Sequence, residues 1–161
     1  MTGAEEYVIE PADPSAWERL AEAVADLPLM KRYGRDAVSL SRAMAESCGP
    51  GGPARILCAQ VTPSHDMAGL VWFHETGTFG MGGYLKLLAV FPGHERRGLG
   101  LRLLRAAERA VVCRSPFFFL LVTEDNEPAI RFYERAGYVR GGRMERLVLP
   151  DADELVYYRR L

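Results

Sequence analysis

The sequence predicts a mixed α/β fold, in which about four helices flank a sheet of about seven strands, mostly antiparallel with a parallel central pair. Residues 85–91 and 117–123 are nearly continuous apolar runs, as expected of buried strands. A helical pattern separates them, and a strand–helix–strand crossover makes its two strands parallel. Shorter apolar runs joined by turn-forming residues precede and follow this unit, and such strands pair antiparallel.

The chain begins with a short predicted strand and an amphipathic helix. The strand covers residues 7–10. Apolar residues recur at helical spacing over residues 17–27, and Asp13 or Ser15 can cap this helix. Pro28 is expected to end or bend it, because proline lacks the N–H that a helix interior needs.

A second helix and two further strands follow before the central strand. The helix is expected over residues 36–48, and the glycine- and proline-rich residues 49–53 break the chain after it. Residues 55–62 and 67–75 are apolar enough for two strands. Four glycines within residues 76–83 predict a loose hairpin leading into the central strand, so these strands form an antiparallel meander.

The chain after the second buried strand predicts one more helix and a hairpin. Pro128 suits a first helical turn, and Gly137 stands where a left-handed residue ends a helix. Residues 138–149 and 154–161 then read as two strands around a turn.

Length and charge narrow the class of protein. A chain of 161 residues can bury one core, so a single domain over residues 1–161 is expected. The net charge of −1 argues against a nucleic-acid or membrane-surface protein. Residues 1–10 lack the basic flank and apolar run of a signal peptide, and no apolar run approaches transmembrane length. The cytoplasm is therefore the expected compartment.

The three cysteines predict neither disulfides nor a metal site. Cys48, Cys58 and Cys113 are scattered, odd in number and without metal-ligand spacing. They suit a reducing compartment and are expected to be core thiols.

The helix between the two buried strands begins at a glycine-containing turn. Pro92 and Gly93 end the strand, and Gly98 and Gly100 open the helix. Glycines let a backbone approach a ligand, and the unpaired N–H groups of a first helical turn favour an anion. Such a turn also occurs for tight packing alone. Neither the phosphate-binding loop of the nucleotide triphosphatases nor the glycine-rich dinucleotide-binding fingerprint is complete here. The turn by itself leaves both roles open.

Two motifs together resemble the GCN5-related N-acetyltransferases, the GNAT superfamily. The resemblance covers the chain from about Met67 to the C-terminus and implies acetyl-coenzyme A as co-substrate, with no metal. The residues that carry it are Leu88-Ala89-Val90, Pro92 and Arg96-Arg97-Gly98-Leu99-Gly100, then Asn126, Ala129, Phe132-Tyr133-Glu134 and Ala136-Gly137-Tyr138.

The resemblance implies three sets of coenzyme contacts. The strand backbone would pair with the pantetheine arm as an added strand does, the amides of the turn would hold the diphosphate, and one asparagine would contact pantetheine or orient its helix. These positions are Leu88, Ala89 and Val90 for the strand, Arg96, Arg97, Gly98, Leu99, Gly100 and Leu101 for the turn, and Asn126. A plain helix cap is the alternative for the asparagine. Glu95 departs from the family pattern and is expected to point outward.

Tyr133 occupies the position of the family's general acid. A phenol with a pKa near 10 stays protonated at neutral pH and can protonate a leaving thiolate. The alternative is an aromatic side chain on the buried face of a helix.

The usual general-base positions hold no carboxylate. Lys86, Leu87 and Leu121 stand where family members often carry one. Glu124, at the end of the second buried strand, is the first candidate base. His74, Glu75 and Tyr84 come next, and a solvated surface role is the alternative for each.

The function implied by the resemblance is acetyl transfer to a primary amine of a small molecule, peptide or protein. Direct attack of the amine on the thioester is expected. No cysteine lies where the central strand meets the following helix, so none is placed to form a covalent intermediate. The alternative is a non-catalytic acyl-coenzyme A sensor or interaction module. Nucleic acid and membrane are not expected partners, and both a monomer and a homodimer remain open.

Overall fold

The computed structural model describes residues 6–161, which form one mixed sheet with helices. Its strands are β1 (Glu6–Pro11), β2 (Ala54–Thr62), β3 (Met67–Thr78), β4 (Gly82–Val90), β5 (Phe117–Thr123), β6 (Val139–Leu149) and β7 (Ala152–Arg160). Its helices are the 3-10 helix η1 (Pro14–Ala16), then α1 (Trp17–Ala25), α2 (Pro28–Arg32), α3 (Ala37–Cys48), α4 (Leu99–Val111) and α5 (Glu127–Arg135).

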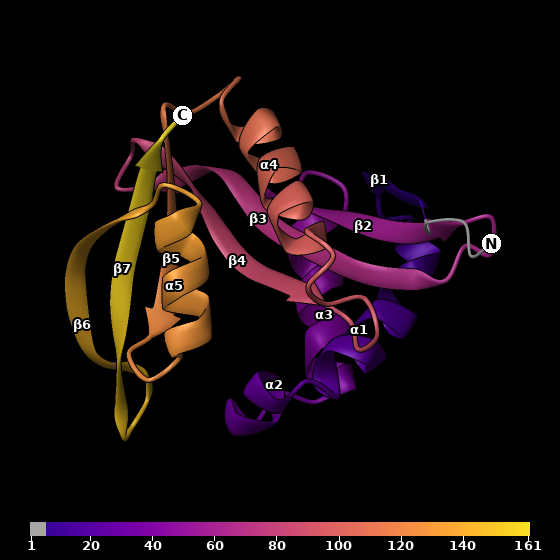
Figure 1. Ribbon diagram of the computed structural model, residues 1–161, viewed down its shortest axis with the longest axis horizontal. Helices are drawn as coiled ribbons and strands as arrows, with labels where there is room; N and C mark the ends of the chain where they lie inside the picture. Colours follow the sequence, from indigo (N-terminus) through magenta and orange to yellow (C-terminus); the bar gives the residue numbers. More distant parts are fainter. Residues whose placement is uncertain (1–5) are drawn as a thin grey trace. The chain divides into compact units, whose positions relative to one another are not determined.

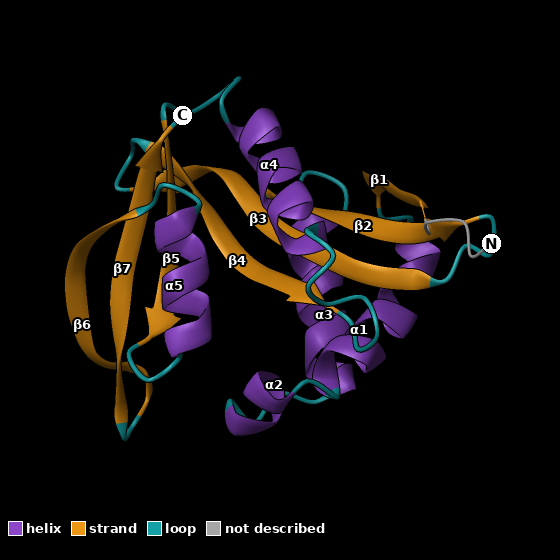
Figure 2. Ribbon diagram, viewed as in Figure 1, coloured by secondary structure: helices purple, strands orange, loops and turns teal. Residues whose placement is uncertain are grey.

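The strands hydrogen-bond in the order β1-β2-β3-β4-β5-β7-β6 (Figure 2). β4 and β5 are parallel, whereas β1 with β2, β5 with β7 and β6 with β7 are antiparallel. This confirms the predicted fold class, including the parallel central pair.

The chain divides into two compact units. The first comprises the residues up to Phe73 together with Leu87–Ala107, and the second comprises His74–Lys86 and Glu108–Leu161. The single domain expected over residues 1–161 stays a prediction. Residues 1–5, on which part of the expectation about a signal peptide rests, lie outside the described chain.

In the first unit, α1 and α3 lie side by side and share a hydrophobic core with β2 and β3 (Figure 1). Leu20 and Val24 of α1, Met44 of α3 and Leu70 of β3 expose none of their surface. Burying a side chain of this size stabilises a fold by about 1.5–3 kcal/mol. Phe91 belongs to the same core, so the core holds the chain where it leaves β4.

The helix expected over residues 17–27 is two helices in the structure. α1 ends at Ala25, and α2 begins at Pro28 after an extended Leu27 (ψ 139°). A proline disfavours the helical conformation in the residue before it, and this explains the break. α2 is the helix that the predicted number of about four did not include. Asp36 caps α3, as its predicted range implied, by accepting a hydrogen bond from the Ser39 N–H at 2.7 Å.

The hairpin expected to be a loose loop over residues 76–83 is tight. β3 extends to Thr78 and β4 begins at Gly82, so only three residues separate the strands. Phe79 and Gly80 adopt left-handed conformations (φ 52° and 68°), and the Met81 N–H donates to the Thr78 carbonyl at 2.9 Å. The glycines therefore shape a turn and do not lengthen it.

The second unit contains the parallel pairing and the C-terminal hairpin. β4 pairs with β5 from Gly82 opposite Phe117 to Leu85 opposite Leu120. β5 has the predicted bounds, and α5 lies beside β7, where the Tyr157 hydroxyl donates to the Glu134 carboxylate at 2.9 Å (Figure 1). Gly137 is left-handed (φ 92°) after α5, as predicted.

β4 is less buried than the apolar run predicted. Leu85 and Ala89 are buried, but Leu88 and Val90 are half-buried and Lys86 is exposed. The prediction of burial on both faces is therefore wrong for much of this strand, because burial depends on what packs against each face and not on composition alone.

The cysteines differ from one another in exposure. Cys58 is buried, and burial raises the pKa of its thiol to about 11. Cys48 is partly buried, and Cys113 is exposed, so the prediction of core thiols is wrong for Cys113. Within residues 6–161, no helix combines the length and apolar character needed to cross a bilayer.

Gly69 allows β3 to approach the backbone of β4 closely. A Cβ added there would lie 2.5 Å from the Ala89 carbonyl oxygen and 3.2 Å from a Leu103 methyl group. Gly69→Ala is expected to lower the free energy of unfolding by about 1–3 kcal/mol, because the backbone must shift to accommodate the methyl group. Urea denaturation followed by circular dichroism measures this.

Gly142→Ala is the matched control, since a Cβ at Gly142 meets no atom within 4 Å. It should change the stability by no more than about 0.5 kcal/mol. Equal stabilities of the two variants would contradict the close approach at Gly69.

Candidate functional site

The turn between β4 and α4 leads into a helix start, where backbone N–H groups lack helical partners. Gly93, Arg96 and Gly98 adopt left-handed conformations (φ 90°, 60° and 75°). α4 begins at Leu99, and its first helical hydrogen bond runs from the Arg102 N–H to the Gly98 carbonyl at 3.1 Å. The N–H groups of Leu99, Gly100 and Leu101 therefore have no partner within the helix, which is the geometry that favours an anion.

The side chains around this turn are exposed, except for half-buried His94 and buried Leu99. Leu99 is 1% exposed and fixes the start of α4 in the core. Glu95 is exposed, as expected, and its carboxylate accepts the Gly93 N–H at 2.8 Å. Hydrogen bonds from its own N–H and from that of Gly93 lower the pKa of Glu95.

Arg97 does not extend freely into solvent from this turn. Its guanidinium donates to the Tyr7 hydroxyl at 3.2 Å, although Tyr7 lies 90 residues earlier in β1. Sequence reasoning missed Tyr7, since a lone tyrosine in an edge strand carries no motif. Arg96 and Arg97 are both exposed, but the hydrogen bond to Tyr7 restrains the Arg97 side chain.

Nine of the ten predicted coenzyme-binding residues lie in the first unit. They are the strand residues Leu88, Ala89 and Val90 and the turn residues Arg96, Arg97, Gly98, Leu99, Gly100 and Leu101. Their predicted contacts with a coenzyme stay predictions.

Asn126, the tenth, belongs to the second unit. Its side-chain oxygen accepts the Ala129 N–H at 3.3 Å, which confirms the helix-cap alternative. A contact with pantetheine stays a prediction.

Tyr133 is a buried tyrosine of α5, with 8% of its surface exposed. Its ring lies edge-on to Phe132 and Tyr138, with centroids 5.1 and 5.8 Å away. Burial, and to a lesser extent Tyr84, raises the pKa of Tyr133 above its ordinary value. The buried-aromatic alternative is thus confirmed for its ring, and its phenol keeps its proton at neutral pH. The acid role stays a prediction.

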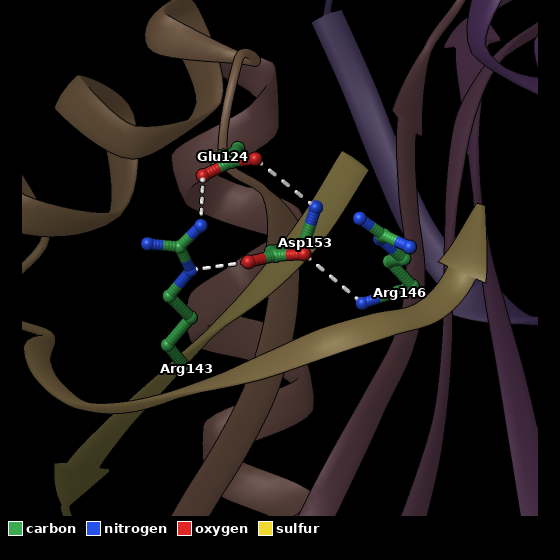
Figure 3. Close-up of polar contacts among 4 residues, drawn as sticks. All are labelled: Glu124, Arg143, Arg146 and Asp153. Carbon is green, nitrogen blue, oxygen red and sulfur yellow. Dashed lines mark hydrogen bonds and ion pairs between the residues drawn. The ribbon is translucent and has the colours of Figure 1, made fainter. Parts of the chain in front are cut away.

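Glu124 takes part in a charged cluster near the turn of the β6–β7 hairpin. Figure 3 shows the Arg143 guanidinium between the carboxylates of Glu124 and Asp153. Arg143 Nη2 lies 3.3 Å from Glu124 Oε2, and the Asp153 N–H donates to Glu124 Oε1 at 3.2 Å. The Arg146 N–H donates to the other side of the Asp153 carboxylate at 3.0 Å. Glu124 therefore has a structural role in joining the end of β5 to this hairpin, and its role as a base stays a prediction.

The other candidate bases differ in availability. Glu75 forms an ion pair with Arg114 at 3.2 Å. His74 lies 6.4 Å from the Tyr84 ring, measured between centroids, and burial followed by the charge of Lys86 lowers the pKa of its imidazole. A lowered pKa keeps His74 neutral at pH 7, so it is able to accept a proton.

The described residues contain no group of three or more His, Cys, Asp or Glu side chains placed to hold a metal ion.

Comparison with known proteins identifies the family. Residues 26–138 match the model of the acetyltransferase (GNAT) family. The chain belongs to this family. A stretch of 76 residues is 34% identical to N-alpha-acetyltransferase 30 of Schizosaccharomyces pombe, covering 47% of this chain and 51% of the relative. The chain thus spans about half the length of this curated relative.

Two solved structures resemble this GNAT family member over most of their length. Spermidine N-acetyltransferase from Vibrio cholerae, in complex with CoA and spermine, has a TM-score of 0.77 at 15% identity and covers 96% of this chain and 95% of its own. Ard1 from Thermoplasma volcanium has a TM-score of 0.76 at 18% identity, with 96% and 97% covered. At these identities the likeness establishes the fold.

The turn of this GNAT protein has the donors that a diphosphate requires. The amides of Leu99, Gly100 and Leu101 open the helix, and a Cβ built on Gly98 meets no atom within 4 Å, so the space beside that residue is open. Arg96 adds an exposed positive charge. The residues present therefore fit the diphosphate of coenzyme A.

The charged cluster makes part of the stability depend on pH. The Arg146 N–H and the Arg143 guanidinium lower the pKa of Asp153 below its unfolded value. Asp153 therefore stabilises the fold above about pH 4, and this contribution is lost as the pH falls through the lowered folded-state pKa. Asp153→Asn should lower the urea midpoint at pH 7, and its midpoint should fall less than that of the wild type between pH 5 and pH 3.

Asp151→Asn, an exposed change in the same hairpin, is the control and should follow the wild type at every pH. If Asp153→Asn shows the full acid dependence of the wild type, the cluster does not stabilise the ionised carboxylate.

Proposed function

We propose that this GNAT family member is an acetyl-CoA-dependent N-acetyltransferase that acts on a primary amine by direct attack. The observation that carries the proposal is the first turn of α4, whose amides have no helical partner and follow three left-handed residues in the family-matched segment. Such a turn suits a diphosphate, and the family's co-substrate contains one.

Each part of the coenzyme has a proposed set of partners in this chain. Acetyl-CoA supplies an activated acetyl thioester when it is bound. The N–H groups of Gly98, Leu99, Gly100 and Leu101 would hold its diphosphate, with Arg96 adding charge-assisted hydrogen bonds. The main chain of residues 88–90 would pair with the pantetheine arm as an added strand does.

Tyr133 is the proposed general acid. Its raised pKa means that its hydroxyl carries a proton throughout the neutral range. A protonated phenol would donate a proton to the leaving sulfur.

A peptide or protein α-amino group is the proposed acceptor. An α-amino group has a pKa near 8, so about one molecule in ten is neutral at pH 7, whereas a lysine-like amine with a pKa near 10.4 is neutral in fewer than about one in a thousand. The α-amine therefore depends less on a strong base, and Lys86, Leu87 and Leu121 supply no carboxylate. The name of the S. pombe relative, N-alpha-acetyltransferase 30, supports the same acceptor. His74 would serve as the proton acceptor, because its imidazole is neutral.

A non-catalytic acyl-CoA sensor is the second candidate. The observation that favours it is the engagement of Glu124 with Arg143 and the Asp153 N–H, which leaves the first candidate base in an ion pair. The cytoplasm remains the proposed compartment for both candidate functions, in keeping with cysteines that are not joined in disulfides among the described residues.

Acetyl-CoA consumption with matched amines separates these candidates. A peptide with a free N-terminus should be acetylated at least tenfold faster at pH 7 than the same peptide with a blocked N-terminus and one lysine, and faster than spermidine, because of the difference in neutral fraction. Release of free coenzyme A is followed with a thiol reagent. A sensor would show a raised melting temperature with acetyl-CoA and no consumption with any amine.

Tyr133→Phe tests the acid. The variant should lower kcat by about a hundredfold or more, since general acid catalysis typically contributes that much, and should leave the Kd for coenzyme A unchanged. Steady-state kinetics and calorimetry measure the two quantities. Tyr158→Phe, which also removes a hydroxyl in the second unit, is the control and should keep full turnover. Unchanged turnover in Tyr133→Phe would remove Tyr133 from the mechanism.

A further inference from the structure

One tyrosine of the N-terminal strand contacts both sides of the diphosphate-binding turn. Tyr7 lies in β1, before the family-matched residues 26–138, and only 5% of its surface is exposed. Its hydroxyl lies 3.1 Å from His94 Nδ1 and accepts a hydrogen bond from Arg97 at 3.2 Å. His94 and Arg97 flank Glu95 and Arg96, so the hydroxyl joins the two sides of the turn's central dipeptide.

The chemistry of the three groups sets the direction of these hydrogen bonds. A guanidinium only donates, so the Tyr7 oxygen accepts from Arg97. The single proton of the hydroxyl is then available for His94 Nδ1, which accepts it when the neutral imidazole carries its proton on Nε2. In this tautomer the donors run in one direction, from Arg97 through Tyr7 to His94.

Tyr7 is itself held against the first turn of α4. Arg102 Nη2 donates to the Tyr7 carbonyl oxygen at 2.8 Å, and the Arg102 guanidinium carbon lies 5.9 Å from the centre of the tyrosine ring. The ring also lies edge-on to that of His94, with centroids 5.7 Å apart. The position of the hydroxyl is therefore determined by the helix whose amides open the anion site.

We propose that Tyr7 is a positioning residue for the coenzyme diphosphate, acting through Arg97 and His94. This inference rests on the proposed function. A hydrogen bond to Tyr7 orders the Arg97 side chain, and an arginine that is already ordered loses less rotamer freedom when an anion binds. Tyr7 thus improves coenzyme affinity without touching the coenzyme.

The test is a double-mutant cycle read by calorimetric binding of coenzyme A. Tyr7→Phe keeps the ring and removes only the hydroxyl. It should weaken the affinity about five- to tenfold in the wild-type background, and less than twofold in the Arg97→Ala background, because the interaction it acts through is already absent there. Tyr158→Phe, a hydroxyl removal elsewhere in the chain, should leave the affinity unchanged.

A second readout separates positioning from a structural role. S-acetyl-pantetheine lacks the diphosphate, so Tyr7→Phe should raise KM for acetyl-CoA and leave kcat for acetyl-CoA and kcat/KM for S-acetyl-pantetheine unchanged. An equal loss with both donors, or an equal effect of Tyr7→Phe in both backgrounds, overturns the proposal. Arg97 is exposed, so Arg97→Ala is expected to fold, and unchanged coenzyme affinity in this variant also overturns it.

The binding experiment distinguishes failure of this inference from failure of the proposed function. If the wild type binds no coenzyme A, the coenzyme site itself is refuted. If the wild type binds it and Tyr7→Phe binds it equally well, only the role of Tyr7 is refuted.

Discussion

The N–H groups at the start of α4 constrain the conformation of the turn between β4 and α4. A helix start leaves its first amides without helical partners, and an N–H group buried without a partner is costly. In this protein those amides follow an exposed turn with left-handed residues at Gly93, Arg96 and Gly98. The buried side chains of Phe91 and Leu99 anchor the two ends of the turn in the core. The turn thus lies at the surface while the apolar residues at its two ends remain buried.

Arg96 is the unusual member of this turn. A left-handed conformation is unfavourable for a residue with a Cβ and is uncommon outside glycine, asparagine and aspartate. Arg96 nevertheless adopts it at φ 60°, between residues that are held by Tyr7. The hydrogen bonds that join His94 and Arg97 to one hydroxyl offset part of this cost, and they link the turn to the N-terminal strand β1.

The second unit contains buried carboxylates that form ion pairs and hydrogen bonds. Glu108, 7% exposed, accepts a hydrogen bond from the Tyr138 hydroxyl at 3.0 Å, and Arg159 Nη1 lies 3.1 Å from both of its carboxylate oxygens. Asp153 is similarly enclosed by Arg143 and the Arg146 N–H (Figure 3). Breaking such a pair leaves an uncompensated charge, so removing one partner is expected to destabilise the unit.

Local chemistry made several elements predictable from sequence alone. The apolar composition of Phe117–Thr123 defined β5, Asp36 marked the start of α3, and Gly137 marked the end of α5, since each depends on residues a few positions apart. Glycines before a helical pattern likewise indicated the turn at α4. The contacts of Arg97 with Tyr7 and of Glu124 with Arg143 were decided by the tertiary structure, because strand pairing and packing bring together side chains that are 90 and 19 positions apart. The exposure of Cys113 and of Lys86 was decided in the same way, since burial depends on the neighbours that the fold supplies and the sequence does not name them.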